Sequence, residues 1–180
     1  MKKAFVLMLL STLGLSQAVW AASSEAKVTY SAAKDTAASD YKVASAKCDS
    51  LVDNPKAVCI AEAKAARVVV EANAKAQYKG TLRSRTTARK DIAEANYKVA
   101  KAKCDAAVGN AKDVCIKEAK AVRVASEADA KADKEVIQAR SNANEDKLTA
   151  EYKVALEKCD TLAGAAKDTC VADAKKQFKK

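Results

Sequence analysis

The sequence predicts an all-α protein, an elongated antiparallel helical bundle of three disulfide-stapled αα-hairpin repeats. Three observations lead to this fold class. A unit that begins at Tyr41 with "YKVASAKCDSLVDNPKAVCIAEAK" returns in similar form at Tyr97 and Tyr152, so one supersecondary structure is used three times. Alanine, the strongest helix former, supplies 42 of the 180 residues. Each copy also holds two cysteines, one on either side of a helix-breaking segment.

Residues 1–21 are predicted to be a signal peptide. Lys2 and Lys3 precede an apolar run over residues 4–15, and small residues follow up to a predicted cleavage site after Ala21. The apolar run is shorter than the roughly 20 residues that cross a membrane. We therefore expect an exported, soluble protein of the periplasm with no transmembrane segment after cleavage. An uncleaved N-terminal anchor is the alternative.

The remaining chain is predicted to form three helical hairpins, at residues 22–79, 80–136 and 137–180. Between its two cysteines each copy has a helix breaker, which is Pro55, Gly109 or Gly164. Proline suits the first turn of a new helix, and glycine suits the residue that ends one. Each repeat is therefore expected to be two antiparallel helices joined at its breaker.

The six cysteines are predicted to form one disulfide in each hairpin. On one straight helix, cysteines 11 residues apart stand about 16 Å apart, too far for a bond. Folded about the breaker, they lie at the same height on facing helices. The expected bridges are Cys48–Cys59, Cys104–Cys115 and Cys159–Cys170. The oxidising compartment favours disulfides, and without histidine or a CxxC pair we expect no metal, redox or other cofactor site.

The repeated tyrosines are predicted to belong to the core of each hairpin. Tyr41, Tyr97 and Tyr152 each precede a cysteine by seven residues, which is two turns along the same helix face. Seven residues past the second cysteine stand small or flexible partners, namely Ala66, Val122 and Gln177. The alanines around them are expected to form a close-packed seam: Ala37, Ala44, Ala63, Ala100, Ala107 and Ala119.

The connections between the hairpins allow two arrangements. Residues 111–159 contain neither proline nor glycine, so one helix of roughly 50 residues can join the second hairpin to the third. Only Gly80 interrupts the stretch before it, and Asn142 is the other position where a break is conceivable. We expect a bundle with the first and third tips at one end and the second at the other. A looser string of three hairpins is the alternative.

A basic stretch is the candidate binding site. It carries six positive charges with no acid over residues 72–90, and we assign anion binding to Lys75, Lys79, Arg83, Arg85, Arg89 and Lys90. In an exported protein the available polyanions are peptidoglycan, lipopolysaccharide and anionic lipid, and no specific nucleic-acid partner is expected. A solvated helix face is the plainer interpretation. Other envelope proteins are further candidate partners, and exposed alanine seams would allow the chain to form oligomers.

The side-chain chemistry disfavours catalysis. The chain has no histidine to activate a serine, no glycine-rich phosphate loop and no isolated carboxylate pair, so no catalytic residue is assigned. The signal peptide and the repeat resemble a group of small, Ala/Lys-rich exported proteins of Gram-negative bacteria. Their composition is similar to the helical middle segment of the cell-envelope protein TolA. The resemblance implies a non-enzymatic structural or interaction protein of the cell envelope, a basic helical rod. The alternative is a holdase chaperone similar to Skp.

Overall fold

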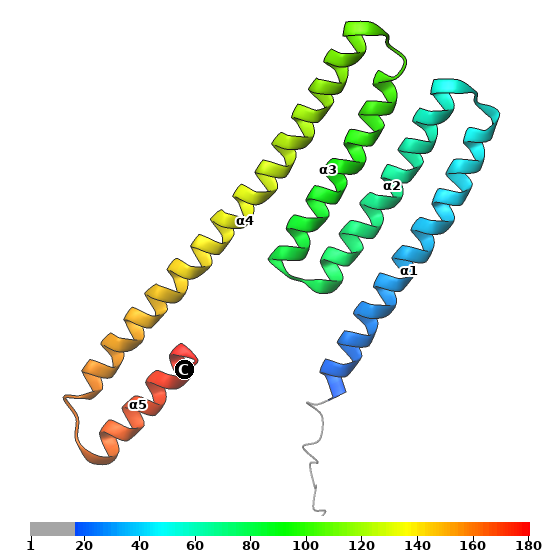
Figure 1. Cartoon of the computed structure of the whole chain (residues 1–180). Helices are drawn as coiled ribbons and strands as arrows, with labels where there is room; N and C mark the ends of the chain where they lie inside the picture. Colours follow the sequence, from blue (N-terminus) through cyan, green and yellow to red (C-terminus); the bar gives the residue numbers. More distant parts are fainter. Residues whose placement is uncertain (1–16) are drawn as a thin grey trace, which may run out of the picture. The chain divides into compact units, whose positions relative to one another are not determined.

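The predicted all-α class is confirmed. The computed structural model describes residues 17–180, which form the α-helices α1 (Gln17–Lys47), α2 (Asp53–Lys79), α3 (Leu82–Cys104), α4 (Gly109–Cys159) and α5 (Gly164–Phe178), and one short 3-10 helix, η1 (Cys48–Ser50) (Figure 1). No strand occurs among these residues. Most of the predicted signal peptide lies outside the described residues. The chain divides into two compact units, Met1–Glu127 and Ala128–Lys180, and α4 runs through the division.

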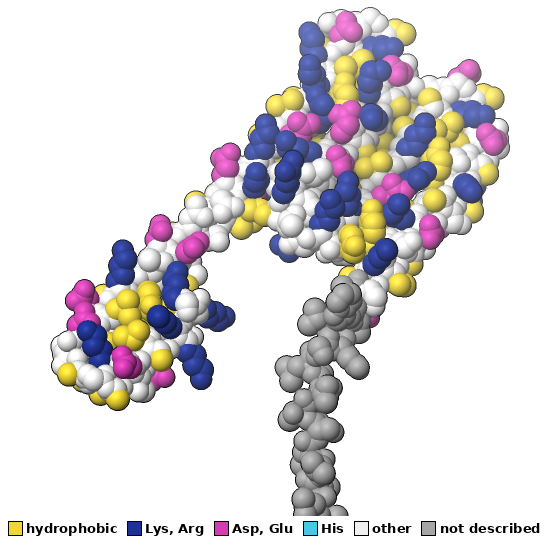
Figure 2. All heavy atoms as spheres, turned by 60° about the horizontal axis from the view of Figure 1, so that its bottom comes forward, with side chains coloured by type: hydrophobic (Ala, Val, Ile, Leu, Met, Phe, Trp, Pro, Cys, Tyr) yellow, Lys and Arg dark blue, Asp and Glu magenta, His cyan; other side chains and the backbone are white. Residues whose placement is uncertain are grey.

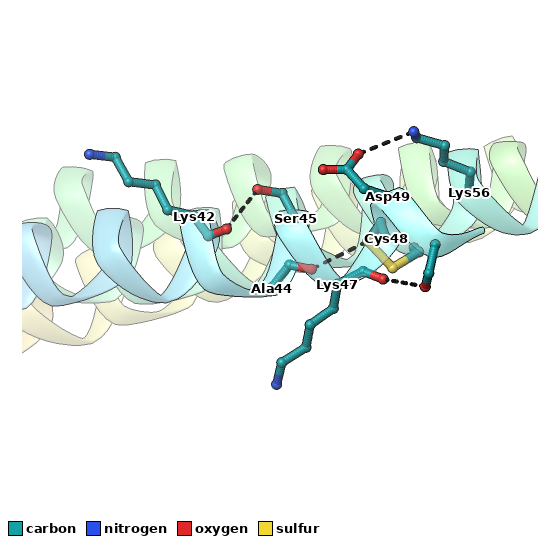
Figure 3. Close-up of a disulfide and its surroundings, with 9 residues drawn as sticks. Lys42, Ala44, Ser45, Lys47, Cys48, Asp49 and Lys56 are labelled. Carbon is teal, nitrogen blue, oxygen red and sulfur yellow. Dashed lines mark hydrogen bonds and ion pairs between the residues drawn. A yellow bond between two sulfur atoms is a disulfide. The ribbon is translucent and has the colours of Figure 1, made fainter. Parts of the chain in front are cut away.

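Each predicted disulfide is present at the tip of a helical hairpin. Cys48 is bonded to Cys59, with their Cα atoms 5.7 Å apart. The pairs Cys104–Cys115 and Cys159–Cys170 have Cα separations of 5.6 Å. Figure 3 shows the first bridge, which joins η1, directly after α1, to the second turn of α2. The chain must reverse within each ten-residue gap, so the hairpin tip brings the two cysteines to bonding distance.

The glycines of the tips begin a helix, which corrects our expectation that they end one. Gly109 is the first residue of α4 and Gly164 the first of α5, with φ angles of 56° and 57°. Asp53 holds the equivalent place in the first hairpin, with φ 53°. These left-handed angles explain the two glycines, because residues with a Cβ rarely adopt them. Aspartate tolerates this conformation better than most residues.

A further turn at Gly80 corrects the predicted placement of the first two tips. The chain reverses there between α2 and α3, whereas α4 continues unbroken through Asn142. Reversal at Gly80 returns the second tip to the same end as the first. Contacts near the tips agree with this, since Asn54 Nδ2 donates to the Ala102 carbonyl at 2.7 Å and Lys103 pairs with Glu62 at 2.8 Å.

The first unit is a row of antiparallel helices in the order α1, α2, α3 and the first part of α4 (Figure 1). Alanines make most of the tight contacts, and the central cluster joins Ala72 and Ala76 of α2 to Ala88 and the half-buried Ile92 of α3. The small side chains let neighbouring helices approach closely. In the second unit, α5 returns along the end of α4, where the Tyr152 and Phe178 rings lie 5.9 Å apart.

Candidate anion-binding turn and an adjoining groove

The basic stretch is folded into a tight turn between α2 and α3. Gly80, with φ 60°, closes α2 by donating its N–H to the Ala76 carbonyl at 3.0 Å. The Thr81 hydroxyl oxygen then caps α3 by accepting from the Ser84 N–H at 3.0 Å. The Ser84 hydroxyl lies 2.8 Å from the Thr81 carbonyl and 3.3 Å from that of Ala76, so it can donate to either. Only Gly80 and Thr81 separate the two helices, which fixes the last turn of α2 close to the first turn of α3.

Three of the six predicted anion-binding residues lie in the helix turns on either side of this link. Lys79 lies in the last turn of α2, and Arg83 and Arg85 lie at the start of α3, all three exposed. We call these three residues the basic turn. The other three predicted residues are placed differently. Lys75 lies one turn earlier and lines a groove along α2. Lys90 is half-buried, and Arg89 already has an interaction within the chain.

The charges of the basic turn interact favourably with the helix dipole of α2 and unfavourably with that of α3. A cation in the last turn of a helix is stabilised by the helix dipole, and Lys79 is placed this way. At the beginning of α3 the dipole is positive, yet its first turn holds no acid and Arg83 and Arg85 stand there. Each such cation costs roughly 0.3–1 kcal/mol. The first unit also carries most of the excess charge, with 20 basic and 13 acidic residues over 22–127 against 11 and 10 over 128–180. Figure 2 shows lysines and arginines crowding its surface (Figure 2).

A stacked tyrosine pair lies near the same end of the first unit and was missed in the sequence. The Tyr30 ring of α1 lies 5.0 Å from that of Tyr78 in α2, at an interplanar angle of 7°. The Lys34 ammonium lies 5.6 Å from the centre of the Tyr30 ring. Tyr30 and Tyr78 stand 18 residues before Cys48 and 19 after Cys59, so counting outward from the disulfide would have paired them.

The repeated tyrosines face residues one position beyond those we predicted, and they are half-buried rather than core. Arg67 lies 5.7 Å from the centre of the Tyr41 ring and Arg123 lies 5.1 Å from that of Tyr97, next to the expected Ala66 and Val122. In the third hairpin Phe178 takes this place, next to the expected Gln177. Helical side chains lean toward the N-terminus of their helix, so the residue covering a given spot stands about one position later in sequence.

Arg123 pairs with two carboxylates in the first unit. One of its terminal nitrogens lies 2.7 Å from Glu94 of α3 and 3.6 Å from Glu127 of α4. The hydrogen bond with Glu94 is the main reason that the pKa of Arg123 lies above its ordinary value, and desolvation acts in the opposite direction. Arg67 makes the simpler pair with Glu71 at 2.7 Å. These contacts position the helices and leave no acid or base free for chemistry at this point.

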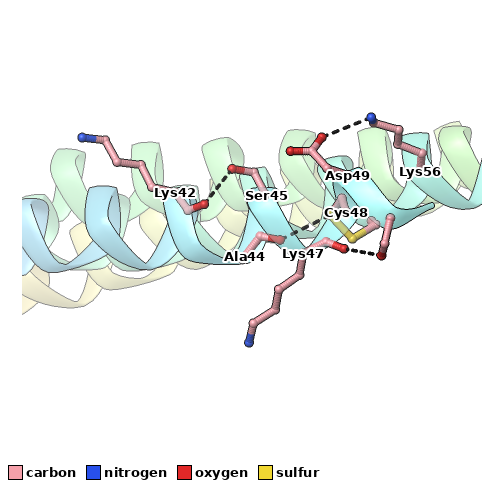
Figure 4. Close-up of polar contacts among 9 residues, drawn as sticks. Lys42, Ala44, Ser45, Lys47, Cys48, Asp49 and Lys56 are labelled. Atoms are coloured by element: carbon pink, nitrogen blue, oxygen red, sulfur yellow. Dashed lines mark hydrogen bonds and ion pairs between the residues drawn. A yellow bond between two sulfur atoms is a disulfide. The ribbon is translucent and has the colours of Figure 1, made fainter. Parts of the chain in front are cut away.

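Each hairpin tip carries the same ion pair beside its disulfide. The aspartate after the first cysteine pairs with the lysine three residues before the second, as Asp49–Lys56 at 3.1 Å, Asp105–Lys112 at 2.9 Å and Asp160–Lys167 at 2.9 Å. Figure 4 shows the first of these, with Ser45 donating to the Lys42 carbonyl one turn away (Figure 4). The hydrogen bond from Lys112 is the main cause that lowers the pKa of Asp105, while desolvation opposes it. The repeat of the pair indicates a structural clasp.

A groove adjoins the basic turn on one face of the first unit. It has a volume of about 710 Å³ and is lined by α1, α2 and α3. Alanines of α2 form its floor, and Lys34, Lys64 and Lys75 are among the charged side chains along it. This volume lies within the range of ligand-binding clefts, roughly 300–1,000 Å³. We refer to it as the α2 groove.

Neither a metal site nor a transmembrane helix is found in the described part of the chain. Over residues 17–180 no three cysteine or carboxylate side chains gather in a way that would hold a metal ion. No helix in the same range is both long and apolar enough to cross a membrane. No protein-family model, curated protein or solved structure matches the chain.

Proposed function

We propose that this protein is a non-enzymatic structural or interaction protein of the bacterial periplasm, a helical protein that binds anionic envelope polymers through the basic turn. The observation that carries the proposal is the placement of Lys79, Arg83 and Arg85. They stand exposed on either side of a two-residue link, with no acid in the first turn of α3. Cations at a helix N-terminus cost stability, so an anion that neutralises them recovers that cost.

The disulfides and the sequence resemblance support the proposed compartment. Three bridged pairs leave no free cysteine among the described residues. Disulfides of this kind persist in oxidising compartments such as the periplasm. The signal-peptide pattern and the TolA-like composition point to the same place.

The proposal is tested by sedimenting the purified protein with peptidoglycan, and separately with vesicles containing anionic lipid. We expect Lys79→Gln, Arg83→Gln and Arg85→Gln together to weaken binding about tenfold, since three surface ion contacts of roughly 0.5 kcal/mol each are lost. Lys75 is left in place because it lines the α2 groove. Lys175→Gln, Lys176→Gln and Lys179→Gln remove the same charge from the second unit and form the matched control.

A stability measurement separates a dedicated site from a charged surface. Without ligand, the basic-turn variant should be slightly more stable than the wild type. It removes two arginines that oppose the α3 dipole and only one lysine, Lys79, that the α2 dipole favours. Loss of binding with a gain in stability supports the proposal. Equal loss of binding in the control variant, or no binding to either anionic material, contradicts it. Protection of an unfolded outer-membrane protein from aggregation, unaffected by the basic-turn variant, would favour the holdase alternative instead.

A further inference from the structure

The α2 groove exists because the first unit is an open row of helices. Among the described residues α2 contacts both α1 and α3, and residues of both neighbours line the groove along α2. One face of α2 is therefore left uncovered between two helices that run parallel to each other. A further helix could pack in this position and complete a closed bundle.

The dimensions of the groove suit a helix. The lining residues of α2 run from Ala61 to Lys75, which is about 21 Å of helix at 1.5 Å per residue. The groove has a volume of about 710 Å³ over that length, so its mean cross-section is about one third of the cross-section of a helix 10–12 Å wide. A helix would therefore lie partly sunk in the groove. The floor includes Ala61, Ala65 and Ala72. Such small side chains allow an incoming helix to approach to the lower end of the usual 8–10 Å interaxial distance.

The uncompensated charge in the groove is positive. Two of its carboxylates are already paired, Glu71 with Arg67 and Glu94 with Arg123. The groove is lined by four lysines, of which Lys98 lies 3.8 Å from Glu94. Within residues 17–180 no carboxylate lies at ion-pair distance from the other three, Lys34, Lys64 and Lys75. Asp91 is the one other acid in the lining. The occupant should therefore carry more negative than positive charge on the face that enters the groove.

The spacing of the lysines specifies the occupant further. Lys64 and Lys75 are 11 residues apart, three turns along one face of α2, or about 16 Å. Carboxylates at the same spacing on an incoming helix would reach both. A sugar polymer fits less well, because both groove tyrosines already have ring contacts within the chain. Tyr30 stacks on Tyr78 and lies close to the Lys34 ammonium, and the Arg67 guanidinium lies over the Tyr41 ring.

We propose that the α2 groove binds an acidic amphipathic helix of a partner protein. Its small apolar residues lie on the alanine floor, and two of its carboxylates, three turns apart, pair with Lys64 and Lys75. Helix-in-groove binding of this kind uses anchor positions on one face of the ligand helix. The groove is a site separate from the basic turn, so either proposal can fail without the other.

The test uses a synthetic, fluorescently labelled 18-residue Ala-rich helix with two glutamates 11 residues apart on one face. We expect the full-length protein to bind it in an anisotropy titration, and Lys64→Gln with Lys75→Gln to weaken binding about fivefold to tenfold. A peptide of the same composition with the glutamates on opposite faces should bind about as weakly. Both lysines are exposed, so the substitutions should leave the fold intact, and circular dichroism checks this.

Matched controls decide the outcome. Lys117→Gln with Lys120→Gln removes the same charge from exposed positions of α4 outside the groove and should leave affinity unchanged. The proposal is overturned if the probe does not bind, if both double variants weaken it equally, or if a peptide with lysines in place of glutamates binds as well. It is also overturned if light scattering shows that the protein self-associates and the groove variant abolishes this, since the occupant is then a second copy.

Discussion

The left-handed residue at each hairpin tip makes a prediction whose sign tests the structure. Gly109 is the first residue of α4, and its φ of 56° is one that residues with a Cβ rarely adopt. A Cβ added there would meet no atom within 4 Å, so Gly109→Ala introduces no collision. Its cost lies in the backbone alone, roughly 1–2 kcal/mol for an L-residue held in the left-handed region.

The net effect is smaller because alanine also restricts the unfolded chain. That restriction stabilises the folded state by roughly 0.4–1 kcal/mol, so Gly109→Ala should lower the free energy of unfolding by about 1 kcal/mol. At an ordinary helical φ the same substitution would raise it by about 0.8–1 kcal/mol, because alanine is the better helix former. The two backbone conformations therefore predict opposite signs.

The assay is urea unfolding of the oxidised protein, followed by circular dichroism at 222 nm. In a thermal melt, Gly109→Ala should lower the midpoint by a few degrees. Asp53→Gly, at the equivalent left-handed position, should leave stability unchanged or raise it slightly. Ala121→Gly, an exposed site within α4, calibrates the ordinary helical case and should cost about 1 kcal/mol. An increase in stability for Gly109→Ala would refute the left-handed assignment.

Three further predictions follow from the contacts. Arg123→Gln should lower the free energy of unfolding in urea titration, because Glu94 loses a hydrogen bond to a charged group; an effect no larger than that of an exposed lysine-to-glutamine change would contradict this. The pKa of Asp105 is lowered in the folded state, so its carboxylate stabilises the fold above about pH 4 and loses this effect on further acidification. Asp105→Asn should therefore reduce the slope of the free energy of unfolding against pH below about pH 4 and leave that slope unchanged near neutrality. Cys159→Ser with Cys170→Ser removes a short-loop bridge worth roughly 3 kcal/mol and should melt α5, seen as loss of helical signal and rapid proteolysis of the C-terminal segment; retained protection would show that α5 packs well enough without it.

The hairpins follow from the periodicity of the chain. The repeat beginning at Tyr41 is rich in alanine, which favours helix, and has a helix breaker between two cysteines. Two helices that reverse at the breaker are the simplest structure that also lets these cysteines form a disulfide. The pairing could be predicted because each cysteine has one partner at its own height on the facing helix. The helix over 111–159 could also be predicted from local sequence alone, since this stretch contains neither proline nor glycine.

The sequence shows the cations of the basic turn, but only the structure shows how they are arranged. A run of cations over 75–90 is visible in the sequence, but whether its members converge depends on what happens at Gly80. Its left-handed φ, with Thr81 as the cap of α3, sets a reversal that local propensity did not distinguish from a kink. That reversal places Lys79 and the two arginines on either side of one link, brings α3 alongside Lys75 to line the α2 groove, and returns the second tip to the end of the first.

What the sequence by itself determined is therefore the helices, the hairpins and the disulfides, because these depend on residues close together in the chain. What only the tertiary structure decided depends on pairs that are distant in sequence. Examples are the stacking of Tyr30 on Tyr78, the link from Arg123 to Glu94, and the groove left open between α1 and α3. Alanine explains the difference: its small, uniform side chain favours helix everywhere but distinguishes poorly among neighbours, so the choice of partner helix falls to the Gly80 reversal and a few larger side chains.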